Sequence, residues 1–183
     1  MNFESYLQHF SAILEQTHIS SPYEDPEYVH HVKMNQTRLK RWLKTAEITA
    51  ETKNAIAAIH SKQKWIVITE PWCGDAAHSI PIIHLMAELN PLIEVDYQLR
   101  DTAPFLIDNY LTNGGKSIPI LVIRDDNDKD IAVWGPRPAA SQQLFSSLKE
   151  QQVSFDEIKT QLQKWYNDDQ SLSIQNEILS LLK

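Results

Sequence analysis

The fold is decided by residues 64–76, which have the sequence KWIVITEPWCGDA. Residues 64–69 form a short apolar run rich in β-branched side chains, and such a run predicts a strand buried on both faces of a sheet. Pro71 ends the strand, because proline cannot continue a central strand. Over residues 75–89 apolar side chains recur every three or four positions, which predicts a helix. Cys73 therefore lies at the junction between a strand and a helix.

This junction favours a reactive thiol. The first backbone N–H groups of a helix have no partner within the helix, and the positive end of the helix dipole stabilises an anion. A thiolate at Cys73 would gain from both effects. Cys73 is the only cysteine in 183 residues, so any disulfide that it forms must involve a second molecule. The alternative is a small buried apolar residue without chemistry.

Two prolines follow the junction at informative places. Pro81 comes eight residues after Cys73, inside the predicted helix, where a proline removes a hydrogen bond at a cost of about 3 kcal/mol. Pro119 follows Ile118 and precedes a second apolar run, residues 120–123, which predicts another strand. Both prolines therefore need a structural purpose.

Together these features resemble the thioredoxin-like superfamily. The resemblance rests on Trp72-Cys73-Gly74, Pro81, Ile118-Pro119 and Val133-Trp134-Gly135, and it covers residues 48–150. It implies an α/β thioredoxin-like fold, a central mixed sheet flanked by helices. It also implies a cis Ile118–Pro119 bond packed against the cysteine, so that the backbone of Ile118 pairs with an extended substrate. Trp72, Ile118 and Pro119 are then the substrate-binding residues, and Cys73 is the catalytic residue.

The resemblance adds four residues that would support the thiolate or the substrate. Gly74 and Asp75 follow the cysteine, Lys116 lies just before the Ile-Pro pair, and Arg137 lies in a loop that borders the active site in the superfamily. A cation there would steady the thiolate or bind a carboxylate of a small thiol. Asp75 suits the first turn of a helix, but its charge opposes ionisation of a nearby sulfur. A plain surface role is the alternative for Lys116 and Arg137.

The chain departs from the superfamily pattern at two positions. Ala76 replaces the second, resolving cysteine of a Cys-x-x-Cys site, and Val67 occupies the position of a buried acid. In the superfamily that acid is thought to accept the proton of the second cysteine, so the loss of both is chemically consistent. With one sulfur, the chain has no internal means to resolve a mixed disulfide with a client protein.

We therefore predict a monothiol thiol–disulfide oxidoreductase that acts through Cys73 on mixed disulfides. Its partners would be protein thiols or mixed disulfides, with no bound cofactor and with glutathione or bacillithiol as co-substrate. One alternative is a redox-inactive module that docks extended peptides on Trp72, Ile118 and Pro119. Another is a single-cysteine redox sensor that forms a sulfenic acid. Whether the chain is an enzyme stays open between these alternatives.

Composition limits the remaining function classes. The net charge of −7 and the pI near 5.4 argue against nucleic acid or an anionic membrane as the main partner. No apolar run is long enough for a transmembrane helix, and the first residues lack the pattern of a secretory signal. A lone cysteine favours the reducing cytoplasm. We expect no metal site, because residues 125–130 lack the glycine and glutamate of a calcium loop, and we expect the histidines at surface or half-buried positions.

The predicted organisation is an N-terminal helical extension (residues 1–47), a thioredoxin-like domain (48–150) and a C-terminal helical tail (151–183), all in one compact unit. Helices outside the domain carry apolar faces, which we expect to pack within the same chain, although a homodimer interface is the alternative to a monomer. Helices are expected at 3–17, 29–44, 49–60, 75–89, 104–111, 139–150, 155–166 and 172–182, and strands at 64–69, 92–99, 120–123 and near 133.

Overall fold

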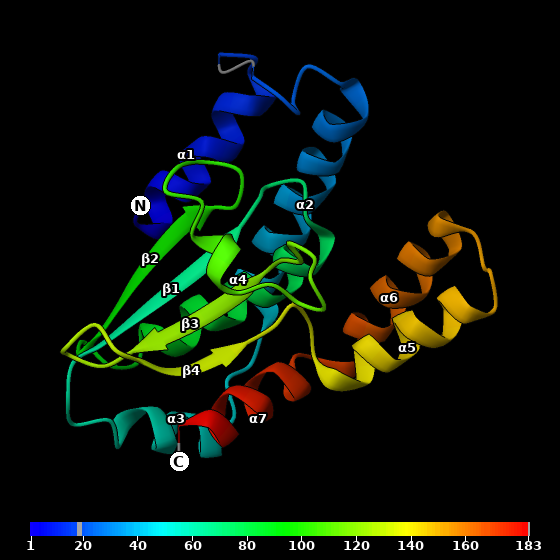
Figure 1. Ribbon diagram of the computed structural model, residues 1–183. Helices are drawn as coiled ribbons and strands as arrows, with labels where there is room; N and C mark the ends of the chain where they lie inside the picture. The colour runs from blue at the N-terminus through cyan, green and yellow to red at the C-terminus, as the bar shows by residue number, and fades with distance from the viewer. Residues whose placement is uncertain (18–19, 183) are drawn as a thin grey trace.

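A mixed sheet lies at the centre of the chain. The computed structural model describes residues 1–17 and 20–182. Within these residues, four strands are arranged in the order β2-β1-β3-β4 (Figure 1). β1 pairs in parallel with β2 and antiparallel with β3, which in turn pairs antiparallel with β4. The strands are β1 (Gln63–Thr69), β2 (Ile93–Leu99), β3 (Ile120–Arg124) and β4 (Asp130–Trp134).

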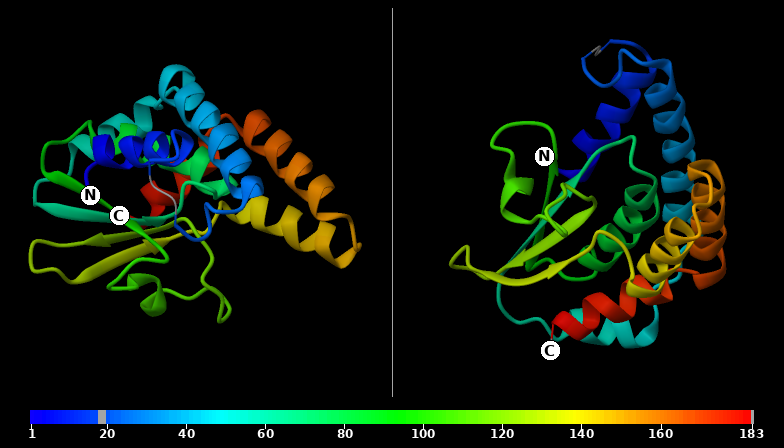
Figure 2. Two further views of the ribbon diagram at one scale, coloured as in Figure 1. Left: turned by 90° about the horizontal axis from the view of Figure 1, so that it is seen from above. Right: turned by 45° about the vertical axis from the view of Figure 1, so that its right-hand side comes forward.

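The apolar run before the cysteine is the central strand, as predicted. Trp65, Ile66, Val67 and Ile68 are all buried. The side chains on both faces of β1 are covered, because helices pack on one face of the sheet and residues 100–118 cross the other (Figure 2). A strand enclosed in this way has no need for polar residues at alternate positions.

Eight helical elements accompany the sheet in the described part of the chain. α2 begins at Pro26 rather than near residue 29 as predicted, because the Asp25 side chain caps it by accepting from the Glu27 N–H (2.8 Å) and proline is accommodated at a first helical position. The bounds are α1 (Phe3–Leu14), α2 (Pro26–Thr45), α3 (Ala50–Ala57), α4 (Gly74–Ala87), the 3₁₀-helix η1 (Leu106–Asn109), α5 (Ala139–Glu150), α6 (Phe155–Asp169) and α7 (Leu172–Leu181).

α4 carries the junction into the interior. Cys73 is its N-cap residue, and Pro81 lies inside it. Most of its side chains are buried, because α4 lies between the sheet and α2 (Figure 1). A helix that is apolar on nearly every side is expected in such a position. The sheet on one side and α2 on the other therefore both contact α4.

The terminal extensions contact the rest of the chain at several places. In α1 the Tyr6 ring stacks on Tyr97 of β2 at 5.3 Å between centroids. In α7 the buried Gln175 side chain accepts from the Thr49 N–H (3.0 Å) and donates to the Glu47 carbonyl (3.0 Å). α6 lies beside α2, where Arg41 donates to Asn167 (2.7 Å). None of the helices described is both long enough and apolar enough to cross a membrane.

Candidate functional site

The Cys73 thiol lies against the loop that precedes β3. Its Sγ donates to the Ile118 carbonyl at 3.3 Å, and its backbone N–H donates to the Glu70 carbonyl at 3.0 Å. The Ile118–Pro119 peptide bond is cis in this structure. The fold thus brings together a sulfur and a backbone carbonyl that are 45 residues apart. Of the predicted substrate-binding residues, Ile118 touches the thiol directly.

The thiol is protonated in this environment. Burial is the main cause that raises the pKa of Cys73, the Asp75 charge is the second, and together with the opposing contacts they bring it to about 12. The Ala76 N–H, the Arg137 charge and the Asp75 N–H oppose this rise, as expected for a sulfur at a helix N-terminus. The dipole effect that the sequence indicated is therefore present, but loss of hydration outweighs it because only 7% of Cys73 is exposed.

Asp75 is held by two side chains from the last third of the chain. One carboxylate oxygen accepts from Arg137 Nη2 (2.6 Å) and Nε (3.1 Å), and the other accepts from the Tyr166 hydroxyl (2.8 Å). The ion pair is largely shielded, with 13% of the Arg137 side chain and 11% of the Asp75 side chain exposed. Arg137 thus lies near the thiol, as the resemblance implied, but its guanidinium is already engaged.

Tyr166 connects this ion pair to a buried histidine. Its ring stacks on His78 at 4.3 Å between centroids. His78 Nδ1 accepts from Trp42 Nε1 (2.8 Å), and Nε2 lies 3.1 Å from the Gln163 amide oxygen. Burial lowers the pKa of His78 to about 3. Our expectation of a surface or half-buried histidine is wrong here, because α2 and α6 cover this face of α4.

The neutral state of His78 predicts a pH-dependent stability. The unfolded histidine takes up a proton below its ordinary pKa of 6.5, whereas the folded one stays neutral until about pH 3. Its contribution is therefore complete above pH 6.5 and is lost as the pH falls. The free energy of unfolding should drop by about 1.4 kcal/mol per pH unit in this window.

Urea unfolding at pH 7 and at pH 4.5 measures this effect in the wild type and in His78→Gln, whose amide also accepts and donates hydrogen bonds. The variant should lose less stability on acidification than the wild type. Parallel pH profiles for the two proteins would show that another group carries the titration.

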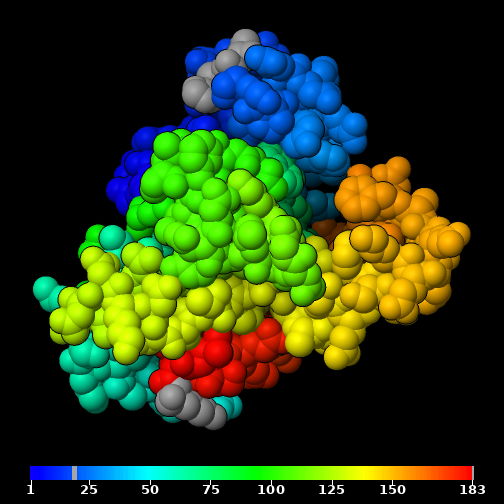
Figure 3. All heavy atoms as spheres, viewed as in Figure 1, coloured from blue at the N-terminus to red at the C-terminus, as the bar shows by residue number. Residues whose placement is uncertain are grey.

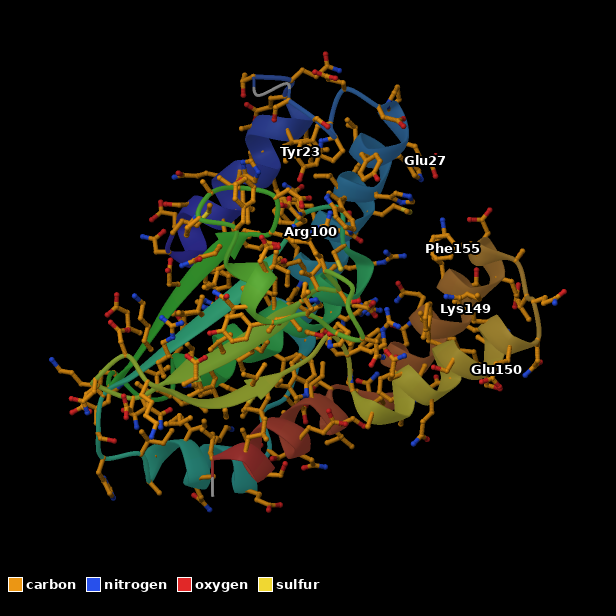
Figure 4. All side chains as sticks on the ribbon, in the orientation of Figure 1. Tyr23, Glu27, Arg100, Lys149, Glu150 and Phe155 are labelled. Carbon is orange, nitrogen blue, oxygen red and sulfur yellow. The ribbon has the colours of Figure 1, made fainter. Side chains whose placement is uncertain are left out.

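A buried acid stands near the thiol at a position that the sequence did not indicate. Val67, at the position of the family acid, is fully buried among apolar side chains, whereas Glu70 follows β1 and is 3% exposed. Glu70 accepts from the Tyr23 hydroxyl (3.1 Å) and from the Asp101 N–H (3.1 Å). Burial raises the pKa of Glu70. Figure 4 labels Tyr23 and, near the same end of the sheet, Arg100. The sequence could have indicated this buried acid, because Glu70 lies between a buried strand and a proline.

Trp72 forms the outer wall of the site. The Arg100 guanidinium lies 4.7 Å from its ring centroid, and the Tyr28 ring meets it edge-on at 5.8 Å. Its indole Nε1 is buried and has no hydrogen-bond partner among the described residues. On the inner side, Asn35 of α2 donates to the Pro71 carbonyl (3.0 Å). The loop before the cysteine is thus fixed by α2, which lies outside the region of resemblance.

Comparison with known proteins identifies the family of this chain. The sequence model of the family described as Thioredoxin matches residues 23–152. The chain belongs to the thioredoxin family. The match begins before α2, so it includes the helix that fixes the loop, whereas the resemblance noted above begins at residue 48.

Two solved structures share the thioredoxin-family fold of this chain. A protein of unknown function from Pseudomonas aeruginosa is 15% identical, with a TM-score of 0.56 over 94% of this chain and 90% of that chain. An HIV epitope scaffold is 14% identical, with a TM-score of 0.59 over 100% of this chain and 98% of that chain. At these identities the likeness shows the fold alone. No curated protein sequence matches the chain.

The remaining predicted residues of this thioredoxin-family site divide into two groups. Gly74 begins α4, and Ala76, which stands where the second cysteine would be, is buried in its first turn. Lys116 instead pairs with Asp108 at 2.7 Å, and about half of each side chain is exposed. Within the described residues, no group of three or more His, Cys, Asp or Glu side chains is placed to hold a metal ion. The arrangement thus combines one buried thiol, a buried acid at the end of β1 and the Ile118 carbonyl that accepts from the thiol.

Proposed function

We propose that this thioredoxin-family protein is a monothiol thiol–disulfide oxidoreductase that acts through Cys73. The observation that carries the proposal is the hydrogen bond between the Cys73 thiol and the Ile118 carbonyl. The hydrogen bond supports the proposal because it sets the sulfur against the backbone that we propose as the docking site of an extended substrate, and the cysteine is also the N-cap residue of α4. The proposed docking surface would include the cis Ile118–Pro119 bond.

Docking supplies a reason for the protonated thiol to ionise. An extended client that pairs with the Ile118 backbone competes for the carbonyl that now accepts from Cys73. Loss of this hydrogen bond removes a contact that favours the neutral thiol, so the thiolate gains relative stability. The N–H groups of Asp75 and Ala76 remain to stabilise the negative sulfur. The thiol is thus unreactive in the free protein and is activated when a client arrives.

The exchange proceeds in two balanced steps. The Cys73 thiolate attacks the small-thiol sulfur of a client mixed disulfide, which forms a bond between Cys73 and the small thiol and releases the client as a thiolate. The thiolate of a second small thiol then attacks this mixed disulfide, which restores Cys73 and releases the oxidised dimer of the small thiol. The electron pair that reduces the client comes, through Cys73, from the thiolate of the second small thiol, while the small thiol of the adduct stays in a disulfide throughout. No internal second cysteine is needed, which suits Ala76.

This proposal defines the partners. Client proteins with a small-thiol adduct are the substrates, and a low-molecular-weight thiol such as glutathione or bacillithiol is the co-substrate, with no bound cofactor. A reducing compartment such as the cytoplasm supplies this thiol in reduced form. The protein would act there as a monomer or as a homodimer, because each exchange requires only one Cys73.

Turnover on a glutathionylated peptide tests the proposal. The wild-type protein should release the free peptide in the presence of reduced glutathione at a rate above the uncatalysed reaction. Cys73→Ser should show only the uncatalysed rate, because serine cannot form the mixed disulfide. Its unfolding transition should match that of the wild type. Equal rates for the two proteins would refute the role of Cys73.

A second candidate function is favoured by the burial of the sulfur. With a thiol pKa of about 12, the free protein holds almost no thiolate at neutral pH. The Trp72, Ile118 and Pro119 surface would then bind an extended peptide without exchange. Partners that remain bound in strong reductant and to Cys73→Ser would support this function, whereas release by reductant alone would support exchange.

A further inference from the structure

A groove separates α2 from α6 on the side of the molecule that carries the cysteine. Figure 3 shows the surface hollowed between these two helices, and in Figure 4 Glu27 on α2 and Phe155 on α6 stand on opposite sides of its mouth. The Arg41–Asn167 hydrogen bond closes the inner end. We call this feature the α2–α6 groove. The residues that face across it, one or two helical turns apart, are His31, Arg38 and Arg41 on α2 and Lys159, Gln163 and Asn167 on α6.

The two arginines of the groove carry charge that no ion pair among the described residues neutralises, whereas His31 and Lys159 lie within ion-pair distance of Glu27 and Asp156. No carboxylate of the described chain lies within ion-pair distance (4.0 Å) of Arg38 or Arg41. Among the described residues, Arg38 Nη1 donates to the amide oxygen of Asn35 (2.9 Å) and to no carboxylate. Partial burial and the neighbouring Arg41 charge lower the pKa of Arg38, which means that both disfavour its cationic form. A bound anion would offset this cost. Such a site is unexpected in a chain of net charge −7.

Arg38 lies next to the reactive junction. Its Nη1 is 3.9 Å from the position that a Cβ on Gly74 would occupy. Gly74 follows Cys73 in the chain and begins α4, so the Arg38 guanidinium lies beside the first residue of that helix. Asn35 fixes this geometry, because its amide bonds both Arg38 and the Pro71 carbonyl. A ligand whose sulfur bonds to Cys73 and whose other end extends past Gly74 would meet the Arg38 guanidinium.

We propose that the α2–α6 groove binds a carboxylate of the small thiol that exchanges with Cys73, with Arg38 as the main contact. A planar guanidinium matches a carboxylate in two parallel hydrogen bonds. Arg137, which the sequence suggested for this role, is occupied by Asp75. The inference rests on the proposed function and makes it specific, because it selects anionic small thiols, such as glutathione, over neutral or cationic ones, such as cysteamine.

The charge of the alkylating reagent gives the first test. Iodoacetate is anionic and iodoacetamide is neutral, so the ratio of their rates at Cys73 reports the potential at the sulfur without any turnover. Arg38→Gln should lower this ratio about threefold to tenfold, as expected for one unit charge several ångströms away near solvent. Lys40→Gln removes the same charge from the opposite side of α2, where Lys40 donates to Gln36, and should leave the ratio unchanged. An equal ratio in wild type and Arg38→Gln would overturn the inference.

Ligand binding gives a test that does not depend on thiol chemistry. S-methylglutathione, which carries the carboxylates but cannot exchange, is titrated by calorimetry into the full chain bearing Cys73→Ser. Adding Arg38→Gln should weaken binding at least tenfold, as loss of a charged hydrogen-bonded partner predicts, while adding Lys40→Gln should not. If binding depends on Arg38 but the wild-type protein shows no turnover on the glutathionylated peptide, the groove is assigned and the proposed exchange is refuted.

Two results would reject the small-thiol assignment. The first is no detectable binding of S-methylglutathione to the Cys73→Ser protein. The second result combines two observations. A peptide disulfide with an aspartate beside its cysteine reacts faster than a neutral peptide in the wild type but not in Arg38→Gln, and S-methylglutathione does not bind. That second result would assign Arg38 to a carboxylate of the client protein instead.

Discussion

Replacing Asp75 by asparagine should accelerate alkylation of Cys73 at pH 7 about tenfold. The Asp75 charge is, after burial, the largest cause that raises the pKa of the thiol. Asparagine has nearly the same size and can still accept from Tyr166, so the change removes a charge with little change in volume. It also leaves the Arg137 cation without its counter-charge, and this cation favours the thiolate.

The magnitude follows from two opposing effects. Removal of a like charge at this range lowers a pKa by about one to three units, which multiplies the thiolate fraction accordingly. A thiolate of lower pKa is also a weaker nucleophile, so about half of that gain on a logarithmic scale reaches the rate. The iodoacetamide rate measured against pH separates the two effects, because the apparent pKa and the plateau rate are obtained together.

A matched control comes from the same region. Asp108→Asn removes one negative charge near the Ile-Pro loop, where Asp108 pairs with the exposed Lys116, and Asp108 is not among the causes of the Cys73 pKa shift. Its alkylation rate should stay near that of the wild type. If Asp75→Asn reacts no faster than Asp108→Asn, then Arg137 and Tyr166 already cancel the Asp75 charge at the sulfur.

Replacing Gly135 by alanine should lower the melting temperature by about 10 °C or more. Gly135 has a φ of +122°, a conformation that side chains rarely adopt, and a Cβ there would lie 2.2 Å from the Pro119 carbonyl oxygen. The Pro119 oxygen is a backbone atom rather than the end of a flexible side chain, so the backbone itself must move. Strain of this kind costs about 1–3 kcal/mol, and the forced displacement adds to it. In a chain of this size, each kcal/mol corresponds to about 2–4 °C.

The displacement should also reach the thiol. Pro119 follows Ile118, whose carbonyl accepts from Cys73. A shifted carbonyl weakens this hydrogen bond, so the variant should show altered alkylation of Cys73 as well as lower stability. Gly115→Ala is the control, because a Cβ there meets nothing closer than 3.5 Å and no left-handed conformation is required. Equal melting temperatures for both variants would contradict the expected clash.

The fold was predictable because its signals are local. The apolar run of β1, the Pro71 break and the helical spacing after Cys73 each act within a few residues, and the structure has the strand and helix where the sequence places them. Start and end positions differ by several residues at some elements, mainly where a cap such as Asp25 decides the first turn. The family match then follows from the same stretch and its neighbours.

The surroundings of the thiol were harder to predict, because they depend on contacts distant in sequence. His78 is buried by Trp42 and Gln163, which are 36 and 85 residues away, and no periodic pattern announces such contacts. Arg38 was overlooked for the same reason. The pKa of the Cys73 thiol could not be predicted either. The sequence indicates that a helix begins at this cysteine, but it does not show how far the sulfur is buried from water.

Tyr166 and Arg137 have a consequence for the chain as it is being made. Asp75 meets its two partners across 62 and 91 residues, so a nascent chain presents the cysteine long before either partner has been synthesised. Until Arg137 and Tyr166 have been synthesised and α6 has docked, the Asp75 carboxylate beside the cysteine lacks both partners. The final electrostatic surroundings of Cys73 therefore form only after at least 93 further residues have been added to the chain.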